Sequence, residues 1–332
     1  MKLIDKYNRV HNYLRISLTD KCNFNCIYCN PSDGDHFLVS KNNILTYEEI
    51  LRIIHIFADK LEFKKIRFTG GEPLVRKSVF EFFNEVKKIK DKFNLQLGIT
   101  TNGTLLEGNA QRLKNTGIEK LNISLDSLKP ELFYKITGRN NLQNVLDAID
   151  ESVEAGFDPV KINMVVIKNI NDNEILDFVE FIKNRNLNVR FIEFMPFGNN
   201  QWARDGFISF DEMKNLIESK YILKPLITDV NEVAKDFSIE GYEGKVSFIT
   251  SMSEHFCNTC NRLRITADGK LRLCLFSTGE KNIDFKALFK NNYSDNEIVQ
   301  LLLEAIIFKW EKHPEAEELT ILEHNNMLKI GG

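Results

Sequence analysis

The first two-thirds of this chain alternates between two hydrophobic patterns. Short runs rich in β-branched and aromatic residues predict strands at 13–19, 65–69, 95–100, 120–125, 160–167 and 188–194. Amphipathic stretches predict helices between them, at 47–60, 78–92, 105–115, 142–155 and 173–186. Strands that alternate with helices form βα units with right-handed crossovers, so a parallel sheet is expected. Six such units fit an open doubly wound sheet or an incomplete barrel, because a closed TIM barrel requires eight.

The alternation stops near residue 199, and the remaining chain has the pattern of a smaller antiparallel β layer with helices. Strands are expected there at 245–251, 261–267 and 270–275, and helices at 210–220 and 295–312. Asp268-Gly269 lies between the last two strands and is a strong signal for a two-residue hairpin. Two domains are therefore predicted, one spanning 1–198 and the other 199–332.

The charge balance excludes some classes of function. The 332 residues include 44 basic and 47 acidic side chains, for a net charge of −3. A nucleic-acid-binding protein would need a basic surface, so binding to nucleic acid is not expected for this chain. No apolar stretch approaches the roughly 20 residues that a membrane helix needs, and the N-terminus has no hydrophobic signal core. A cytoplasmic protein with no membrane contact is expected.

The six cysteines form two groups of three, and a chain of this length needs no disulfides for stability. Cys22, Cys26 and Cys29 directly follow the first strand, at the sheet edge where α/β folds place active sites. Three thiolates suit a soft metal centre. A structural zinc ion would want a fourth ligand, and His36 is poorly spaced for that role. Three cysteines on a 4Fe–4S cluster would leave one iron open to another ligand.

The second group, Cys257, Cys260 and Cys274, also has three thiols and no fourth. The first two lie in a loop, and the third follows the hairpin after it. A structural zinc ion with a further ligand such as His255 is one interpretation. A second iron–sulfur cluster with an open iron is the other.

Basic residues lie inside the predicted parallel strands, at Arg15, Arg67, Lys161 and Arg190. Helices cover the outside of such a sheet, so these side chains are expected to point into the barrel. Arg262 and Arg264 are two residues apart on a later strand and share one face. Buried cations need anions, and arginine suits bidentate contact with phosphate. These residues therefore predict a polyanionic substrate.

The stretch 16–31 resembles the signature loop of radical S-adenosylmethionine (SAM) enzymes, and Gly70-Gly71-Glu72-Pro73 resembles their block that holds the SAM amino group. The resemblance implies an incomplete (βα)6 barrel of the TIM type. It also implies that SAM binds the open iron of a 4Fe–4S cluster, and that one electron from the reduced cluster cleaves it to methionine and a 5′-deoxyadenosyl radical. The SAM contacts implied are Tyr28, Gly71, Ser124 and Met195. Tyr28 and Met195 could equally be core residues.

A narrower resemblance, to the GTP 3′,8-cyclase (molybdenum cofactor biosynthesis protein A) family, runs from residue 13 to 332. It rests on both cysteine groups, on Asn261–Arg264, on residues 190–195 and on the terminal Gly331-Gly332. It implies a second 4Fe–4S cluster whose open iron binds the guanine of GTP. The GTP contacts implied are Arg15, Arg67, Thr100, Lys161, Arg262, Leu263 and Arg264; Arg190 is added because of its strand position. The catalytic residues implied are Arg262, Arg264, Gly331 and Gly332.

The same resemblance implies a lyase that abstracts the ribose 3′ hydrogen of GTP and forms 3′,8-cyclo-7,8-dihydro-GTP, the first step of molybdenum cofactor biosynthesis. Implied partners are an electron donor such as flavodoxin or ferredoxin and the next enzyme, cyclic pyranopterin monophosphate synthase. The sequence leaves open whether the chain forms a homodimer. The Gly331-Gly332 tail could thread into the cavity or be a frayed chain end. Its deletion should abolish cyclisation and leave both clusters intact.

Two other functions remain open on the sequence. Another radical SAM enzyme with an auxiliary cluster, such as a peptide maturase, would also carry two cysteine groups. A peptide substrate needs no polyphosphate pocket, so the basic residues on the strands argue against it. A non-catalytic metal or iron–sulfur carrier would have no use for the Gly-Gly-Glu-Pro block.

Overall fold

The computed structural model describes residues 1–29, 39–40, 43–197, 200, 202–277, 283–320 and 327–331. Its strands are β1 (Leu3–Ile4), β2 (Val10–His11), β3 (Tyr13–Ser17), β4 (Lys65–Thr69), β5 (Gln96–Thr101), β6 (Lys120–Ser124), β7 (Val160–Val166), β8 (Leu187–Glu193), β9 (Leu223–Pro225), β10 (Ala234–Ile239), β11 (Lys245–Ile249), β12 (Arg262–Ile265) and β13 (Leu271–Arg272). Its helices are α1 (Tyr47–His55), α2 (Val79–Phe93), α3 (Ala110–Asn115), α4 (Pro130–Thr137), α5 (Leu142–Glu154), α6 (Ile175–Phe181), α7 (Phe210–Glu218), α8 (Phe285–Lys290), α9 (Asp295–Ile306), α10 (Ala316–Leu319) and α11 (Met327–Ile330).

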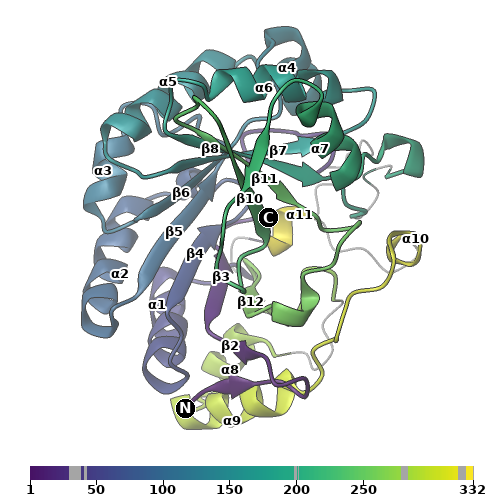
Figure 1. Cartoon of the computed structure of the whole chain (residues 1–332). Helices are drawn as coiled ribbons and strands as arrows, with labels where there is room; N and C mark the ends of the chain where they lie inside the picture. The colour runs from purple at the N-terminus through teal and green to yellow at the C-terminus, as the bar shows by residue number, and fades with distance from the viewer. Residues whose placement is uncertain are drawn as a thin grey trace.

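The central feature is one curved sheet with the strand order β13-β12-β3-β4-β5-β6-β7-β8-β11-β10-β9 in the described part of the chain. Strands β3 to β8 are the six predicted from the sequence, and each pairs in parallel with the next. Figure 1 shows α1, α2, α3 and α5 along the outside of the curve. The predicted incomplete (βα)6 barrel is therefore confirmed.

The C-terminal strands form the expected antiparallel pairs, β11 with β10, β10 with β9, and β12 with β13. The sequence pattern did not predict that two of them also join the barrel. Strand β12 pairs in parallel with β3, and β11 pairs in parallel with β8. The C-terminal part thus extends both edges of the barrel sheet. The predicted domain boundary at 198–199 lies outside the described residues.

The helices that cover the sheet are amphipathic and locally capped. In α1, Ile50, Ile53 and Ile54 are fully buried against the sheet, and Thr46 forms a capping box with Glu49. Helix α3 begins five residues later than predicted, because Gly108 adopts a positive φ of 69° in the turn before it. Helices α4, α8, α10 and α11 and strands β1, β2, β9 and β10 were not predicted.

The helix predicted at 295–312 ends at Ile306, so its last six residues were predicted wrongly. Tertiary contacts hold these residues in another conformation. The guanidinium of Arg9 donates to the backbone oxygens of Trp310 and Glu311, at 2.6 and 2.8 Å. The Lys309 ammonium donates to the backbone oxygen of Arg262, at 3.0 Å. Side chains distant in sequence therefore override the local helical pattern.

Helix α11 lies on the inner side of the curved sheet, next to the last described residues (Figure 1). Gly331, which follows it, is buried beside Ser17 on β3 and Thr69 on β4. Within the described residues, no helix combines the length and the apolar character that crossing a bilayer would require.

Candidate active site

The first cavity lies at the carboxyl ends of the barrel strands and has a volume of about 180 Å³. Its wall includes the thiols of Cys22, Cys26 and Cys29. The residues predicted to contact SAM lie in the same wall: Tyr28, Gly71, Ser124 and Met195. Thr100, predicted to contact GTP, also belongs to this wall and not to the basic cavity described below. The structure therefore brings the first cysteine group and the predicted SAM contacts together.

The two glycines after β4 let their loop approach the cysteine loop closely. A Cβ at Gly70 would lie 2.6 Å from the backbone oxygen of Thr19, and one at Gly71 would lie 2.4 Å from that of Lys21. The Gly71 amide donates to the Thr19 oxygen at 2.7 Å. Any side chain here would push the two loops apart. The glycines thus fix the position of the cysteine loop relative to β4.

Glu72 connects three loops at this edge of the barrel. Its buried carboxylate accepts hydrogen bonds from the amides of Leu74 and Asn102 and from the Thr101 hydroxyl, at 3.0, 2.6 and 2.8 Å. Burial raises the pKa of Glu72 to about 7, although these hydrogen bonds oppose the shift. Asn102 in turn donates to Asn23 in the cysteine loop. This network holds the loops after β4 and β5 against the first cysteines.

Tyr28 is anchored in the cavity wall. Its hydroxyl donates to Asp126 at 2.6 Å, and the same carboxylate accepts from the Val165 amide at 2.9 Å. Burial raises the pKa of Asp126 to about 6 and raises that of the Tyr28 phenol. The ring of Tyr28 therefore has a fixed place between the cysteine loop and strand β7.

The first three thiols lie in surroundings that oppose ionisation. Burial raises the pKa of Cys22 to about 11, and it also raises the pKa values of Cys26 and Cys29. Negative charge on neighbouring thiols and on Asp126 acts in the same direction on Cys26 and Cys29. Thiolates at such a site are favoured only when a cationic metal centre binds them and displaces their protons.

The second cysteine group lines a smaller cavity of about 70 Å³ with Cys257, Cys260 and Cys274. The charged side chains near this group are positive, whereas Asp126 near the first group is negative. Burial would raise the pKa of Cys260, but the positive charges of Lys309 and Arg262 lower it to about 6. Lys309 is only 2% exposed, and its ammonium also donates to the Leu273 backbone oxygen. This site therefore favours a thiolate at Cys260 even without a metal.

The positions of the possible metal ligands bear on the zinc interpretation of each group. Within the described residues, no three His, Cys, Asp or Glu side chains converge on a point where one ion could sit. His255 does not line the second cavity, and its Nε2 lies 3.6 Å from Glu315. His36 lies outside the described residues. Three thiols in the wall of one cavity are also the ligand set that a 4Fe–4S centre with one open iron would use.

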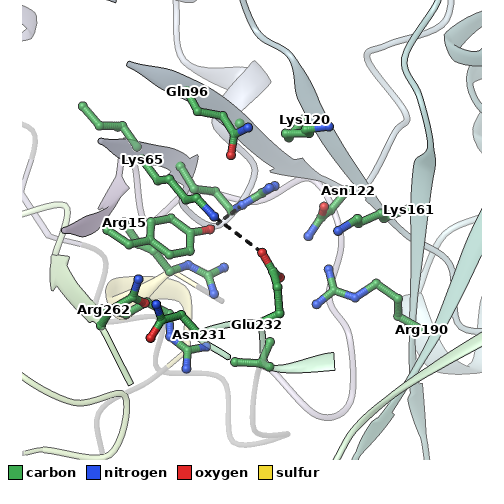
Figure 2. A pocket seen from close by; sticks show the side chains of 16 residues that line it. Arg15, Lys65, Gln96, Lys120, Asn122, Lys161, Arg190, Asn231, Glu232 and Arg262 are labelled. Carbon is green, nitrogen blue, oxygen red and sulfur yellow. Dashed lines mark hydrogen bonds and ion pairs between the residues drawn. The ribbon is translucent and has the colours of Figure 1, made fainter. Parts of the chain in front are cut away.

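The third cavity lies inside the barrel, toward the amino-terminal ends of its strands. It is strongly basic (Figure 2). Five of the predicted substrate contacts line it: Arg15, Arg67, Lys161, Arg190 and Arg262. Lys65 and Lys120 also line it and were missed. Lys65 lies two residues before Arg67 on β4, so the alternation of a strand could have placed both on one face. The predicted cluster of cations inside the barrel is confirmed.

Arg67 is held by neighbours that the sequence analysis did not identify. Its Nε donates to the Tyr13 hydroxyl at 2.9 Å, and its Nη1 donates to the Ile99 backbone oxygen at 2.7 Å. A Cβ at Gly98 would lie 2.8 Å from Nη2 of Arg67. The absence of a side chain at Gly98 therefore makes room for the guanidinium. A glycine inside a strand is a known signal of such a close approach.

The cations in this cavity repel one another. Burial lowers the pKa of Lys161 to about 8, and the charge of Arg190 adds to the shift. Burial and the charge of Arg67 lower the pKa of Arg190 to about 10. Burial alone would raise the pKa of Tyr13, but Arg67 and Arg15 lower it to about 8. A bound polyanion would relieve this repulsion.

Several polar atoms in the cavity walls are left for a ligand. Among the described residues, buried atoms without a hydrogen-bond partner include Asn122 Oδ1, Arg190 Nε, Thr100 Oγ1 and Asn163 Oδ1. The first two line the basic cavity, and the other two line the first cavity. Buried polar groups are nearly always paired, so these atoms fit a site that a polar ligand completes.

The remaining predicted residues lie as follows. Arg264 lines the second cysteine cavity, and its Nη1 donates to the Gly331 backbone oxygen at 3.4 Å. Leu263 was predicted to contact substrate, but its side chain is fully buried in the hydrophobic core. It points away from the cavity because neighbouring residues on a strand face opposite sides. Gly332 lies outside the described residues.

The three cavities are neighbours that share lining residues. Met195 lines both the first cavity and the second cysteine cavity. Arg262 lines both the second cysteine cavity and the basic cavity. The two thiol groups therefore line neighbouring cavities, and the basic cavity adjoins that of the second group.

Comparison with known proteins identifies the class of this fold and site. Residues 16–182 match the model of the radical SAM superfamily, and residues 187–315 match the model described as Molybdenum Cofactor Synthesis C. The structure of SuiB from Streptococcus suis superimposes on 87% of this chain and 68% of its own, with a TM-score of 0.59 at 14% sequence identity. The chain belongs to the radical SAM superfamily, whose members use SAM and a 4Fe–4S cluster.

Full-length relatives narrow the assignment. The GTP 3′,8-cyclase of Syntrophomonas wolfei is 44% identical over 99% of this chain and 100% of its own length. Within the superfamily, this chain belongs to the GTP 3′,8-cyclase family. Molybdenum cofactor biosynthesis protein 1 of Dictyostelium discoideum is 43% identical over 99% of this chain, which covers 52% of that relative. The chain thus spans about half the length of such relatives.

Proposed function

We propose that this chain converts GTP to 3′,8-cyclo-7,8-dihydro-GTP, the first step of molybdenum cofactor biosynthesis, as a radical SAM lyase. The observation that carries the proposal is the basic cavity, which adjoins a second group of three thiols inside the same barrel. GTP carries several negative charges at one end and a polar base at the other. A peptide substrate without acidic groups would leave most of the cations of the cavity without a counter-charge.

The first cysteine group would hold the cluster that binds SAM. Cys22, Cys26 and Cys29 supply three thiolates, and the open wall beside them contains Gly71 and Ser124. When bound, this centre supplies one-electron reduction of SAM and so the species that abstracts hydrogen from substrate. The protein's own contribution is to position SAM and to exclude water from the enclosed barrel.

The second group would hold a second 4Fe–4S cluster, on Cys257, Cys260 and Cys274. Arg262 lies between this group and the basic cavity, so it is placed to orient a substrate that reaches both. Arg67, Lys161 and Arg190 would neutralise the phosphates by charge-assisted hydrogen bonds. Gly331, held by Arg264, would close the interior from the side of the chain end.

We also propose the division of the chain into domains 1–198 and 199–332. The proposed partners are an electron donor such as flavodoxin or ferredoxin, cyclic pyranopterin monophosphate synthase as the next enzyme, and a second copy of the chain in a homodimer. A cytoplasmic location is proposed on the same basis. The electron donor and the next enzyme rest on the family resemblance, and the domain division rests on the end of the βα alternation near residue 199.

Anaerobic reconstitution tests the function directly. Iron is counted per chain, and 5′-deoxyadenosine formation from SAM is measured under reducing conditions with and without GTP. About eight iron atoms and turnover that depends on GTP are expected from two four-iron centres. SAM cleavage at the same rate with and without GTP would point to another substrate. An iron content of about four atoms per chain would contradict the second cluster.

A further inference from the structure

The basic cavity contains one acidic side chain among the described residues that line it, Glu232. Figure 2 shows its carboxylate reaching from one side into the space between Lys65, Arg15, Lys161 and Arg190. Its Oε1 lies 3.6 Å from the Lys65 ammonium. Glu232 thus occupies the region of the cavity in which an anionic ligand would meet these cations.

The charge of Glu232 acts on both walls of the cavity. Burial would raise the pKa of Glu232, but the positive charges of Lys161, Lys65 and Arg190 lower it, so the carboxylate is ionised at neutral pH. In turn, Glu232 raises the pKa values of Lys161 and Arg190 against the effect of burial. Asp236 has a similar effect, but its carboxylate accepts a hydrogen bond from Ser247 at 2.7 Å within the sheet.

The segment that carries Glu232 is attached loosely to the rest of the fold. It connects β9 to β10, and its tip exposes Ile227 fully and Val230 to 72%. One backbone hydrogen bond, from Glu232 to Asp229, holds the turn itself at 2.9 Å. The Glu232 side chain is 42% exposed at the mouth of the cavity. The segment can move outward without disturbing the hydrophobic core.

We propose that Glu232 is a built-in competitor for the phosphate groups of the substrate. It neutralises part of the basic cavity when no ligand is bound, and the phosphates displace it when they enter. This inference rests on the proposed function, because it assumes that the cavity binds a polyphosphate. Occupancy of the cavity then depends on the number of ligand charges, since an uncharged nucleoside gains nothing from displacing a carboxylate.

The test compares wild type with Glu232→Gln, in anaerobically reconstituted protein with SAM present. A matched control is Glu240→Gln, which removes a carboxylate that pairs with Lys224 on β9, at the same edge of the sheet but outside the cavity. Equilibrium dissociation constants are measured for GTP, inorganic tripolyphosphate and guanosine. An exposed ion pair contributes modestly, so E232Q is expected to bind GTP and tripolyphosphate about fivefold more tightly, with guanosine and E240Q unchanged.

Unchanged or weaker binding of tripolyphosphate by E232Q would overturn the proposal, and so would tighter binding of guanosine to the same degree. If neither protein binds GTP while E232Q still binds tripolyphosphate more tightly, the proposed function fails and this inference stands. A second measurement follows the segment itself. Backbone amides of 227–233 should exchange hydrogen faster when tripolyphosphate is added to wild type, and slower or unchanged exchange would contradict displacement.

Discussion

The two cysteine groups have the same number of thiols but lie in opposite electrostatic surroundings. The first cavity has Asp126 in its wall and, among its described lining residues, no lysine or arginine. The second has Arg262, Arg264 and Lys309 in its wall. Burial and negative neighbours raise the thiol pKa values at the first group. At the second group, positive neighbours lower the pKa of Cys260, although burial raises that of Cys257.

This difference matches the charge of the two proposed ligands. SAM carries a cationic sulfonium, which suits a wall whose described residues include the Asp126 carboxylate and no basic side chain. GTP carries several negative charges, which suit the cations around the second group. Two sites with the same ligand count can therefore select different molecules through the sign of the surrounding charge.

The largest expected effect separates the two groups by removing one thiol from each. Cys26→Ala should lose the cluster at the first group and reduce SAM cleavage below detection. Cys260→Ala should keep that cluster and its ability to bind SAM but form no cyclised product. Iron content, SAM binding and product formation measure both outcomes. Loss of SAM binding in the Cys260 variant would show that the two sites do not act separately.

The next prediction concerns Gly331, which lies between the two sites. A Cβ there would lie 2.2 Å from Thr69 Oγ1, so Gly331→Ala should expel the end of the chain. Cyclisation should fall by about two orders of magnitude, which corresponds to about 3 kcal/mol in the barrier. SAM should still bind, because Cys22, Cys26, Cys29 and Gly71 stay in place, although Met327 and Leu328 of α11 would leave the wall of the first cavity.

The matched control is Gly156→Ala. Gly156 has a similar φ of 80°, against 77° at Gly331, but nothing lies within 4 Å of an added Cβ. Both variants carry the same backbone strain, and only one has the clash. Equal loss of cyclisation in the two variants would mean that strain, and not the position of the chain end, causes the effect.

A smaller effect is expected from Gly98→Ala, which tests the basic cavity alone. The added methyl group would lie 2.8 Å from Arg67 Nη2 and should displace the guanidinium. Loss of a charge-assisted contact costs about 2 kcal/mol, so GTP binding should weaken roughly 30-fold while SAM binding stays the same. Titration calorimetry measures both constants. Gly206→Ala is the control, since its nearest neighbour would lie at 3.9 Å.

The smallest expected effect is a pH dependence of GTP binding. In the free protein the pKa of Lys161 is lowered to about 8, so its ammonium loses its proton as the pH rises through 8. Bound phosphates favour the charged form and raise this pKa. GTP binding should therefore take up a proton above pH 8 and weaken by several-fold between pH 7 and 9.

Calorimetry in buffers of different ionisation enthalpy measures this proton uptake. Lys161→Met should reduce the pH dependence. The part that remains should come from Tyr13, whose pKa of about 8 leads to a negative phenolate in the same pH range. SAM binding should show no such dependence on Lys161. An unchanged pH profile in the Lys161 variant would contradict this assignment.

The repetitive part of the fold could be predicted from the sequence. Strand β4 has the predicted bounds, 65–69, because its apolar and polar residues alternate between clear turn residues. The C-terminal part was harder. Strand β10 has no strong alternation, and β11 and β12 join the barrel edges through pairing partners more than fifty residues away. Local patterns carry no information about such partners.

The candidate site divides in the same way, into residues that the sequence predicts and residues that only the folded structure identifies. Arg15, Arg67, Lys161 and Arg190 were predicted because a charge inside a buried parallel strand is unusual. Gly98 and Tyr13 were missed, because their role depends on the position of the Arg67 guanidinium. Glu232 was missed because it comes from a connecting segment whose course depends on how β9 and β10 pair with the barrel.

The sequence by itself determined the ligand count, the βα alternation and the presence of cations within the strands. These properties depend on residue type and spacing, which short-range physics converts directly into structure. Only the tertiary structure decided which charges surround which thiols. Lys309 is close to Cys260, and Asp126 to Cys29, through folding of distant segments. Electrostatic interaction depends on distance in space, so the contrast between the two cysteine groups is a property of the folded chain.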